Sequence, residues 1–412
     1  KDGTSSITYG VSEGVFKVYY KPNGKREFQS VWESDISVEF IPVHLDHEKQ
    51  HLYVLTDYQS NYKHIRKYDL LKLEFTNFAI KAPSRDIVSV IRSPYDGEIL
   101  GYRYLQGGVY QSVYLSQLED LDKVHVMSYS KDKNDYIYLE EGVDKPAEFY
   151  LKANENIYFL GLSRPHLKGY KLGSSKVIKL ISTDGQEIES YLTLPNSKSK
   201  NLPLIVMPHG GPIGVNDNRH FSNIVHYFAV NGFAVLRPNY RGSSGFGRKF
   251  LEQGKQQWGR LIEEDIQSAL HKSIAKGFVD KARVCILGIS YGGYSALMSA
   301  IKYPDDYQCA ISYAGVTDLP LLYSQQELSQ SGQKILSEIV GDIELEQETL
   351  IEHSPAYNSE KLSIPVLIAQ GGLDRVVDKE HYYRMLYFLE QNDTDYQALY
   401  FNNEIHGFKK LS

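Results

Sequence analysis

The sequence lacks any hydrophobic run that approaches the roughly 18 residues a membrane-spanning helix needs. It also lacks a strong charge of either sign, because its net charge is only −6 over 412 residues. Such a balance gives no electrostatic reason to bind nucleic acid or an anionic membrane. Residues 1–9 contain no apolar core of a signal peptide. We therefore expect a soluble protein, cytoplasmic or periplasmic, with neither nucleic acid nor membrane as a partner.

Cysteine is scarce, with only Cys285 and Cys309 in the whole chain. Both fall in predicted buried strands, where a thiol packs like a small apolar side chain, so we expect two free thiols and no disulfide or metal pair. The aspartates and glutamates show no spacing typical of metal ligands. We accordingly expect neither a metal nor an organic cofactor.

The chain falls into two parts in which hydrophobic residues recur with different periods. Residues 1–173 show short alternating strands between polar turns, with almost no helical periodicity. The strands recur in sets about 40–50 residues apart, which is typical of four-stranded propeller blades. We predict an all-β, β-propeller-like domain over residues 1–173, incomplete at about three to four blades. A β-sandwich is the alternative.

Residues 174–412 alternate apolar strands with helices, a pattern that favours a mostly parallel sheet covered on both faces. A hairpin around Asp184-Gly185 opens this part, and six apolar strands follow it, which predicts an eight-stranded sheet. Residues 379–391 carry apolar side chains at helical spacing, and Asp378 stands where it would cap that helix. We predict an α/β catalytic domain over residues 174–412.

The sequence Gly288-Ile-Ser290-Tyr-Gly292 lies between a predicted buried strand, Val284–Leu287, and a predicted helix, Tyr294–Lys302. A turn this tight from strand to helix crowds its neighbours, so small residues are needed two positions either side of the serine. The turn would expose the Ser290 hydroxyl above the sheet, next to a helix N-terminus that favours negative charge. This pattern predicts a nucleophilic serine.

Two further loops follow predicted strands and carry an acid and a base. Asp374 follows the strand that ends at Ala369, and His406 follows the last strand, which ends at Phe401. Reactive groups of an open parallel sheet sit beyond the carboxyl ends of its strands. The chain order Ser290, Asp374, His406 is that of α/β-hydrolases, so we predict a catalytic triad of these residues.

A loop rich in glycine, Pro208-His-Gly210-Gly211-Pro, follows another predicted strand. Glycines let backbone N–H groups approach a ligand closely, which an oxyanion hole requires alongside the amide after the nucleophile. We therefore predict oxyanion donors at Gly210, Gly211 and Tyr291. The chemistry that these groups support is acyl transfer without a cofactor.

Across residues 177–408 the chain resembles the prolyl oligopeptidase family of serine peptidases. The resemblance is carried by His209-Gly-Gly-Pro, Pro238-Asn-Tyr-Arg-Gly-Ser-Ser-Gly-Phe-Gly, Gly288-Ile-Ser-Tyr-Gly-Gly-Tyr, Gly371-Gly-Leu-Asp-Arg-Val-Val and His406-Gly. It implies an α/β-hydrolase domain preceded by a β-propeller that restricts access to the cleft. It also implies more propeller blades and a further helix after His406. This sequence has fewer predicted blades and no predicted helix after His406. It is therefore either a shortened relative or a chain whose ends lie outside this sequence.

The form His-Gly-Gly-Pro is most similar to the acylaminoacyl-peptidase branch of that family. Dipeptidyl peptidases have a tyrosine where this chain has His209 and an asparagine where it has Val376, so specificity for proline is not implied. Glu140-Glu141 is similar to their paired glutamates, although a solvated turn is the favoured interpretation. Residues expected either to line an apolar pocket for substrate or to belong to the core are Tyr291, Tyr294, Val316, Leu319 and Leu322.

The sequence thus predicts a serine peptidase that acts on short peptides, of the acylaminoacyl or dipeptidyl type. A carboxylesterase with the same machinery is one alternative, and an inactive propeller-based binding protein is another. Homo-oligomerisation is left open, although the resemblance implies association through sheet edges or propellers.

Overall fold

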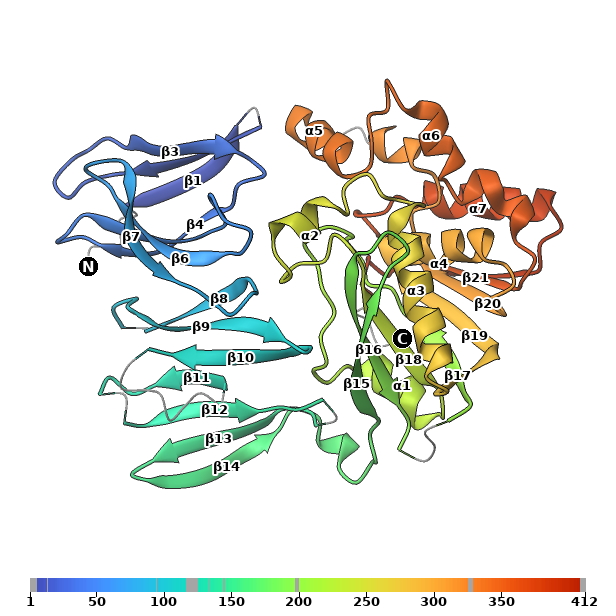
Figure 1. Ribbon diagram of the computed structural model, residues 1–412, viewed down its shortest axis with the longest axis horizontal. Helices are drawn as coiled ribbons and strands as arrows, with labels where there is room; N and C mark the ends of the chain where they lie inside the picture. The colour runs from blue at the N-terminus through green and yellow to red at the C-terminus, as the bar shows by residue number, and fades with distance from the viewer. Residues whose placement is uncertain are drawn as a thin grey trace.

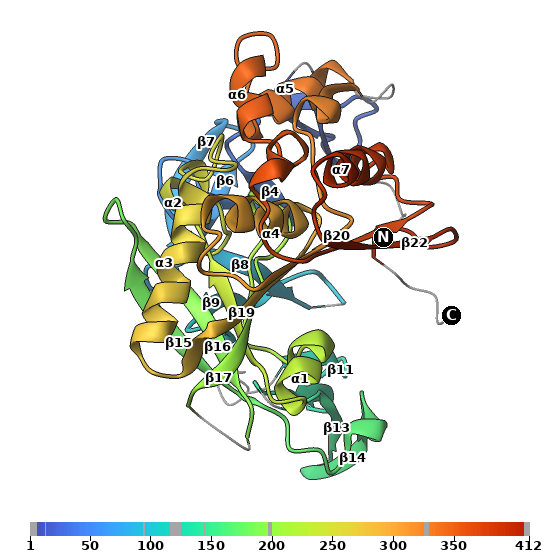
Figure 2. The same cartoon turned by 90° about the vertical axis from the view of Figure 1, so that its right-hand side faces the viewer.

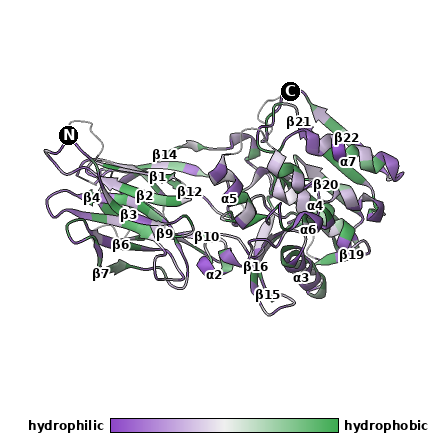
Figure 3. Cartoon of the chain, turned by 90° about the horizontal axis from the view of Figure 1, so that it is seen from above, coloured by the Kyte–Doolittle hydropathy of each residue, from purple (hydrophilic) through white to green (hydrophobic). Residues whose placement is uncertain are grey.

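A computed structural model describes residues 6–12, 14–93, 95–115, 125–132, 134–143, 145–196, 200–324 and 329–407. The chain forms two parts that lie side by side, one made of small sheets and one of a large sheet with helices (Figure 1). Seen from above, hydrophobic segments run along strands of both parts (Figure 3). Among the described residues, no helix is both long and apolar enough to cross a bilayer.

The first part contains four antiparallel sheets, in each of which strands consecutive in the chain are neighbours. The first two sheets are β1 (Ile7–Ser12), β2 (Val15–Tyr20) and β3 (Gln29–Asp35), then β4 (Phe40–Asp46), β5 (His51–Thr56), β6 (His64–Asp69) and β7 (Glu74–Ile80). The next two are β8 (Ile87–Arg92), β9 (Ile99–Gln106) and β10 (Val109–Tyr114), then β11 (His125–Tyr129), β12 (Tyr136–Glu140), β13 (Glu148–Ala153) and β14 (Asn156–Leu162).

Aromatic side chains fill the space between successive sheets. Trp32 of β3 stacks on Phe40 of β4 with ring centroids 4.5 Å apart, and the Tyr68 hydroxyl of β6 donates to the Val31 carbonyl at 2.8 Å. Each of three small cores draws its buried residues from two neighbouring sheets. Small sheets that pack face to face in chain order are typical of propeller blades and favour the predicted propeller over the sandwich.

The second part is built on one eight-stranded sheet, as predicted, in the order β15-β16-β18-β17-β19-β20-β21-β22. β15, β16 and β18 pair antiparallel, and the remaining pairs are parallel. The strands are β15 (Ser174–Ile181), β16 (Glu187–Leu194), β17 (Leu202–Val206), β18 (Ala234–Asn239), β19 (Val279–Ile289), β20 (Cys309–Tyr313), β21 (Val366–Gly371) and β22 (Tyr396–Phe401).

Helices cover this sheet on both sides, with α1 and α3 on opposite faces (Figure 2). The predicted helix over residues 379–391 is confirmed as α7, and Asp378 Oδ1 accepts a hydrogen bond from the Glu380 amide at 2.8 Å. The helices are α1 (Asn223–Val230), α2 (Arg248–Glu252), α3 (Leu261–Ala275), α4 (Tyr291–Lys302), α5 (Gln330–Ile339), α6 (Gln347–Glu352) and α7 (Glu380–Gln391). One continuous core joins the sheet to these helices.

The two cysteines form a disulfide, so the prediction of free thiols is wrong. Cys285 of β19 and Cys309 of β20 are direct partners in the parallel ladder, with Cα atoms 4.7 Å apart. This separation lies within the range that a disulfide bridges. The register between the two strands decides the pairing, and the spacing of 24 residues in the sequence does not reveal it.

Polar contacts from loops connect the two parts. The Asp86 carboxylate, which precedes β8, accepts hydrogen bonds from the amides of Gly245 and Gly247 at 3.2 and 3.1 Å. Arg85 pairs with Glu189 of β16 at 3.1 Å. β14 ends at Leu162 and β15 begins at Ser174. We propose that the boundary between the two domains lies at residue 173, where the change in hydrophobic periodicity predicts it.

Candidate active site

β19 runs directly into α4 through a tight turn at Ser290. Ser290 has a φ of 60° and a ψ of −127°, a strained conformation for a residue with a side chain. A Cβ on Gly288 would lie 2.0 Å from the Gly292 carbonyl oxygen, and one on Gly292 would lie 2.3 Å from the Pro208 carbonyl oxygen. The expected need for small residues on both sides of Ser290 is therefore confirmed.

Ser290 stands at the N-terminus of α4, as the residue before its first turn. The first N–H groups of a helix have no intrahelical acceptor, and the helix dipole places partial positive charge at that end. The Tyr291 N–H is the first of these groups. Negative charge that develops beside Ser290 would therefore be stabilised.

Asp374 and His406 meet at the carboxyl ends of β21 and β22. His406 Nδ1 lies 2.7 Å from Asp374 Oδ2, and Asp374 Oδ1 accepts hydrogen bonds from the amides of Val376 and Val377 at 2.8 and 3.1 Å. Burial alone would raise the pKa of Asp374, but the bonds from His406 and the two amides outweigh it and lower that pKa below its ordinary value. The carboxylate thus stays charged and can orient the imidazole.

Two glycines allow the loops that carry this pair to approach each other. A Cβ on Gly371 would lie 2.6 Å from the Glu404 carbonyl oxygen, and one on Gly372 would lie 2.8 Å from that of Asn402. The Gln370 amide group donates to Asp374 Oδ2 at 3.3 Å and to the Val377 carbonyl at 3.2 Å. Gln370, which the sequence did not single out, therefore holds the acidic loop in place.

Tyr313, the last residue of β20, joins the serine turn to the histidine loop. Its carbonyl accepts the Ser290 amide at 3.0 Å, and its hydroxyl donates to the carbonyls of Ile405 and His406 at 3.3 and 3.1 Å. Sequence reasoning missed this residue. Its place at the carboxyl end of the strand beside the serine strand is the signal that would have identified it.

The loop after β17 carries Gly210 and Gly211 past the serine turn. A Cβ on Gly210 would lie 3.4 Å from the Ile289 carbonyl oxygen and 3.6 Å from Ser290 Cβ. His209 Nδ1 lies 2.7 Å from the Gly210 carbonyl oxygen. Because a trans peptide points its N–H opposite to its C=O, the Gly211 N–H faces away from His209. The loop thus brings candidate donors against the nucleophile.

His209 is itself held by the loop after β18. The His209 ring stacks on the Tyr240 ring with centroids 4.2 Å apart. His209 Nε2 lies 2.9 Å from Ser243 Oγ, and the Tyr240 hydroxyl donates to the His209 carbonyl at 2.7 Å. Burial lowers the pKa of His209, which favours the neutral ring at neutral pH. His209 therefore acts as a half-buried support for the glycine loop.

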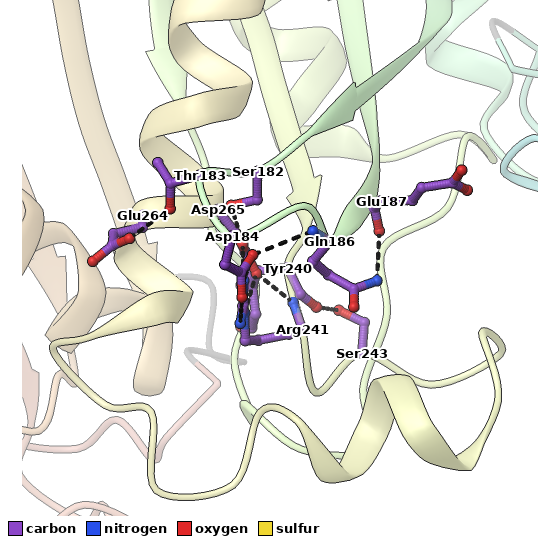
Figure 4. A network of polar contacts seen from close by, with 10 residues as sticks. All are labelled: Ser182, Thr183, Asp184, Gln186, Glu187, Tyr240, Arg241, Ser243, Glu264 and Asp265. Carbon is purple, nitrogen blue, oxygen red and sulfur yellow. Dashed lines mark hydrogen bonds and ion pairs between the residues drawn. The ribbon is translucent and has the colours of Figure 1, made fainter.

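An ion network around the buried Arg241 and Asp265 fixes the loop after β18 in turn (Figure 4). Arg241 donates to Asp265 at 2.7 and 2.8 Å and to Asp184 at 2.8 and 3.0 Å, while Ser182 Oγ donates to Asp265 Oδ1 at 2.6 Å. The bonds from Arg241 lower the pKa of Asp184 to about 2. This network explains the Asn-Tyr-Arg-Gly-Ser sequence as a structural support, since it positions Tyr240 and Ser243.

The residues predicted to line an apolar pocket are buried in the main core. Tyr294, Val316, Leu319 and Leu322 are at most 8% exposed and pack in one cluster with Tyr291. The Tyr294 hydroxyl donates to the His353 carbonyl at 2.9 Å. Their burial supports the core interpretation that the sequence left open, and the pocket stays a prediction.

A cavity of about 810 Å³ lies between β8–β12 and the loop that carries His220. Glu141 Oε1 lies 2.9 Å from His220 Nδ1, and Glu140 Oε2 lies 3.5 Å from Lys145 Nζ. Both glutamates therefore have a basic partner. Within the described ranges, no group of three or more His, Cys, Asp or Glu side chains is placed to hold a metal ion.

Comparison with known sequences gives matches to peptidases. Residues 219–412 match the sequence model of the prolyl oligopeptidase family. The chain is 28% identical over 325 residues to dipeptidyl peptidase family member 6 of Caenorhabditis elegans, covering 72% of this chain and 44% of the relative. It is 29% identical over 222 residues to the acylamino-acid-releasing enzyme of Sus scrofa, covering 49% of this chain and 29% of the relative. It thus spans less than half the length of these relatives.

Comparison with solved structures gives the same family of folds. A puromycin-hydrolysing peptidase of Mycobacterium tuberculosis superposes with a TM-score of 0.78 at 23% identity, over 96% of this chain and 63% of that one. At this identity the likeness concerns the fold. The predicted combination of a β-propeller region with an α/β-hydrolase sheet is confirmed.

Proposed function

We propose that the chain hydrolyses short peptides by acyl transfer through Ser290, His406 and Asp374, as a member of the prolyl oligopeptidase family, whose sequence model residues 219–412 match. The observation that carries the proposal is the 2.7 Å bond between His406 and Asp374, in a loop that Tyr313 ties to the strained Ser290 turn. An acid–imidazole pair tied through Tyr313 to the turn of a half-buried serine supplies the groups that nucleophilic catalysis requires.

In this reaction Ser290 Oγ attacks the substrate carbonyl while His406 Nε2 takes the hydroxyl proton. Asp374 keeps the proton on His406 Nδ1 and stabilises the imidazolium. The C–N bond then breaks, and the leaving amine takes the proton from His406. Water, activated by the same imidazole, hydrolyses the acyl ester and restores Ser290.

The oxyanion of the tetrahedral intermediate would accept hydrogen bonds from the Tyr291 amide and from the amides of Gly210 and Gly211. Each such donor is worth roughly 3–4 kcal/mol of barrier in comparable enzymes. The helix dipole of α4 adds to this stabilisation.

Within this class we favour substrates with an acylated N-terminus. One named relative is an acylamino-acid-releasing enzyme and another a dipeptidyl peptidase family member, so relationship alone does not separate the two types. A free N-terminal ammonium would need an unengaged carboxylate. Glu141 Oε1 already lies 2.9 Å from His220 Nδ1, which favours a neutral acyl group over an ammonium at this carboxylate.

A fluorophosphonate probe tests the enzyme class. We expect wild type to be labelled, and Ser290→Ala to lose labelling and at least about a thousandfold of hydrolysis. Ser299→Ala, a buried serine in the middle of α4, is the matched control and should be labelled like wild type. An unlabelled wild type, or equal labelling of Ser290→Ala, would leave the inactive binding protein as the better interpretation.

A substrate panel tests the finer assignment. We expect acyl-aminoacyl peptides to be cleaved faster than dipeptidyl, internal prolyl and simple ester substrates. Faster turnover of dipeptidyl substrates would contradict the preference for an acylated N-terminus. Ester turnover without any peptide turnover would identify the carboxylesterase alternative.

A further inference from the structure

A cluster of buried aromatic rings and one carboxyl group lies directly beneath the serine turn. It consists of Tyr240 of the loop after β18, Trp258, Glu263 of α3, and Tyr291 and Tyr294 of α4, all at most 5% exposed. Because α4 begins at Tyr291, the cluster holds the first helical turn after the nucleophile.

Glu263 makes a direct contact with the residue that follows Ser290. The Tyr291 hydroxyl donates to Glu263 Oε1 at 3.0 Å, and the Trp258 ring packs edge-on against the Tyr291 ring at 4.4 Å. Glu263 is fully buried, at 0% exposure. A buried carboxyl group costs folding free energy, so its place against the Tyr291 hydroxyl calls for a role.

The second oxyanion segment reaches the same cluster. The Tyr240 and Tyr291 rings pack against each other with centroids 5.8 Å apart. The Tyr240 hydroxyl also donates to the carbonyl of His209, the residue directly before Gly210 and Gly211. Both segments that carry candidate donor amides are therefore anchored by tyrosines in one packed unit. A displacement of Tyr291 would change the angle of its own N–H and disturb its neighbour Tyr240.

We propose that Glu263 is a positioning residue, which holds the Tyr291 side chain and thereby aims the Tyr291 amide at the oxyanion. The inference rests on the proposed function, since it assigns the amide that acyl transfer would use. Glu263 does not touch substrate. Its effect is transmitted through one hydroxyl hydrogen bond and the α4 backbone.

The protonation state of Glu263 determines which substitution preserves its hydrogen bond with Tyr291. Burial raises its pKa to about 7, against opposing effects of Lys302, Ser295 and Tyr291. The neutral carboxyl, like an amide, still accepts from Tyr291. Burial raises the pKa of Tyr240, Tyr294, Tyr303 and Tyr307, and the charge of Glu263 adds to that effect, whereas none of these four hydroxyls is among the groups that set the pKa of Glu263.

The test compares Glu263→Leu, Glu263→Gln and Tyr291→Phe on the full chain, with p-nitrophenyl acetate as the substrate. We expect Glu263→Leu and Tyr291→Phe to lower kcat by about tenfold or more with KM within about twofold, because only the transition state uses the amide. Glu263→Gln should retain most of the activity. Tyr307→Phe, which removes a buried hydroxyl bonded to Gln267, is the control and should keep wild-type kcat.

The outcomes separate this inference from the proposed function. An unlabelled wild type in the fluorophosphonate assay refutes the proposed function itself. With a labelled wild type, the positioning role is refuted by wild-type kcat in Tyr291→Phe, by a loss confined to KM, or by an equal loss in Glu263→Gln. If Glu263→Leu does not fold, Tyr291→Phe alone decides, because it removes the same bond and leaves the carboxyl in place.

Discussion

The two parts of the molecule bury their hydrophobic residues in different ways. The first has three small cores, each shared by two successive sheets, whereas the second has one core that spans the sheet and its helices. In the first part stability is expected to be a sum of neighbour contacts. The second part holds every residue of the predicted triad, on loops that a rigid shared sheet brings together. The comparison indicates that the residues of the predicted triad rest on the part with the single continuous core.

The largest loss of activity is expected from a variant in the second part. Asp374→Asn should lower kcat by about 10⁴-fold, because the amide cannot hold the proton on His406 Nδ1. The matched control is Asp378→Asn, four residues away, whose side chain accepts from the Glu380 amide at the start of α7 and which should leave kcat within about threefold. Steady-state kinetics on both variants measures the difference. Equal kcat values would contradict the assignment of Asp374.

A variant at the junction should separate stability from chemistry. Asp86→Ala removes the acceptor for the amides of Lys63, Gly245 and Gly247. Each buried donor left without a partner costs about 1–3 kcal/mol, so we expect a clear loss of unfolding free energy. Because Asp86 lies in the first part, kcat on p-nitrophenyl acetate should stay within about threefold.

Chemical denaturation and kinetics on the same samples measure both quantities. Asp132→Ala, in an exposed turn of the first part, is the control and should change unfolding free energy by less than about 1 kcal/mol. A large loss of kcat in Asp86→Ala without loss of stability would show that the first part takes part in the chemistry.

The smallest effect concerns the ion network behind the glycine loop. Asp184 has a pKa of about 2 in the folded chain, below its ordinary value of 3.8, so its stabilisation is present above pH 4 and is lost as the pH falls toward 2. The side chain is 39% exposed, and solvent screening therefore keeps the effect small. Melting temperatures of Asp184→Asn between pH 2 and 5 should fall less steeply than those of wild type. Parallel curves would contradict this role.

Much of the fold followed from local patterns. The eight strands of the sheet, helix α7 with Asp378 at its start, and the glycines around Ser290 were predicted because alternation, helical spacing and steric crowding are local properties. The opening sheet β1–β3 was not predicted, since its strands were not among the recurring sets. The residues of the triad remain a proposal, supported by the contact between Asp374 and His406.

Contacts between distant segments could not be inferred in the same way. The Cys285–Cys309 disulfide depends on strand register, and Tyr313 and Gln370 act through hydrogen bonds to loops far away in the chain. Glu263 was not singled out because nothing in its local sequence shows that α3 packs it against Tyr291.

The sequence by itself determined the eight strands of the large sheet, helices α4 and α7, the tight serine turn and the chain order of serine, acid and base. Only the tertiary structure decided which side chains support them, from the aromatic cluster under Tyr291 to the network around Arg241. The physical reason is range. Backbone sterics and hydrophobic periodicity act within a few residues, whereas a buried polar group finds its partner only after the sheet has brought separate loops together.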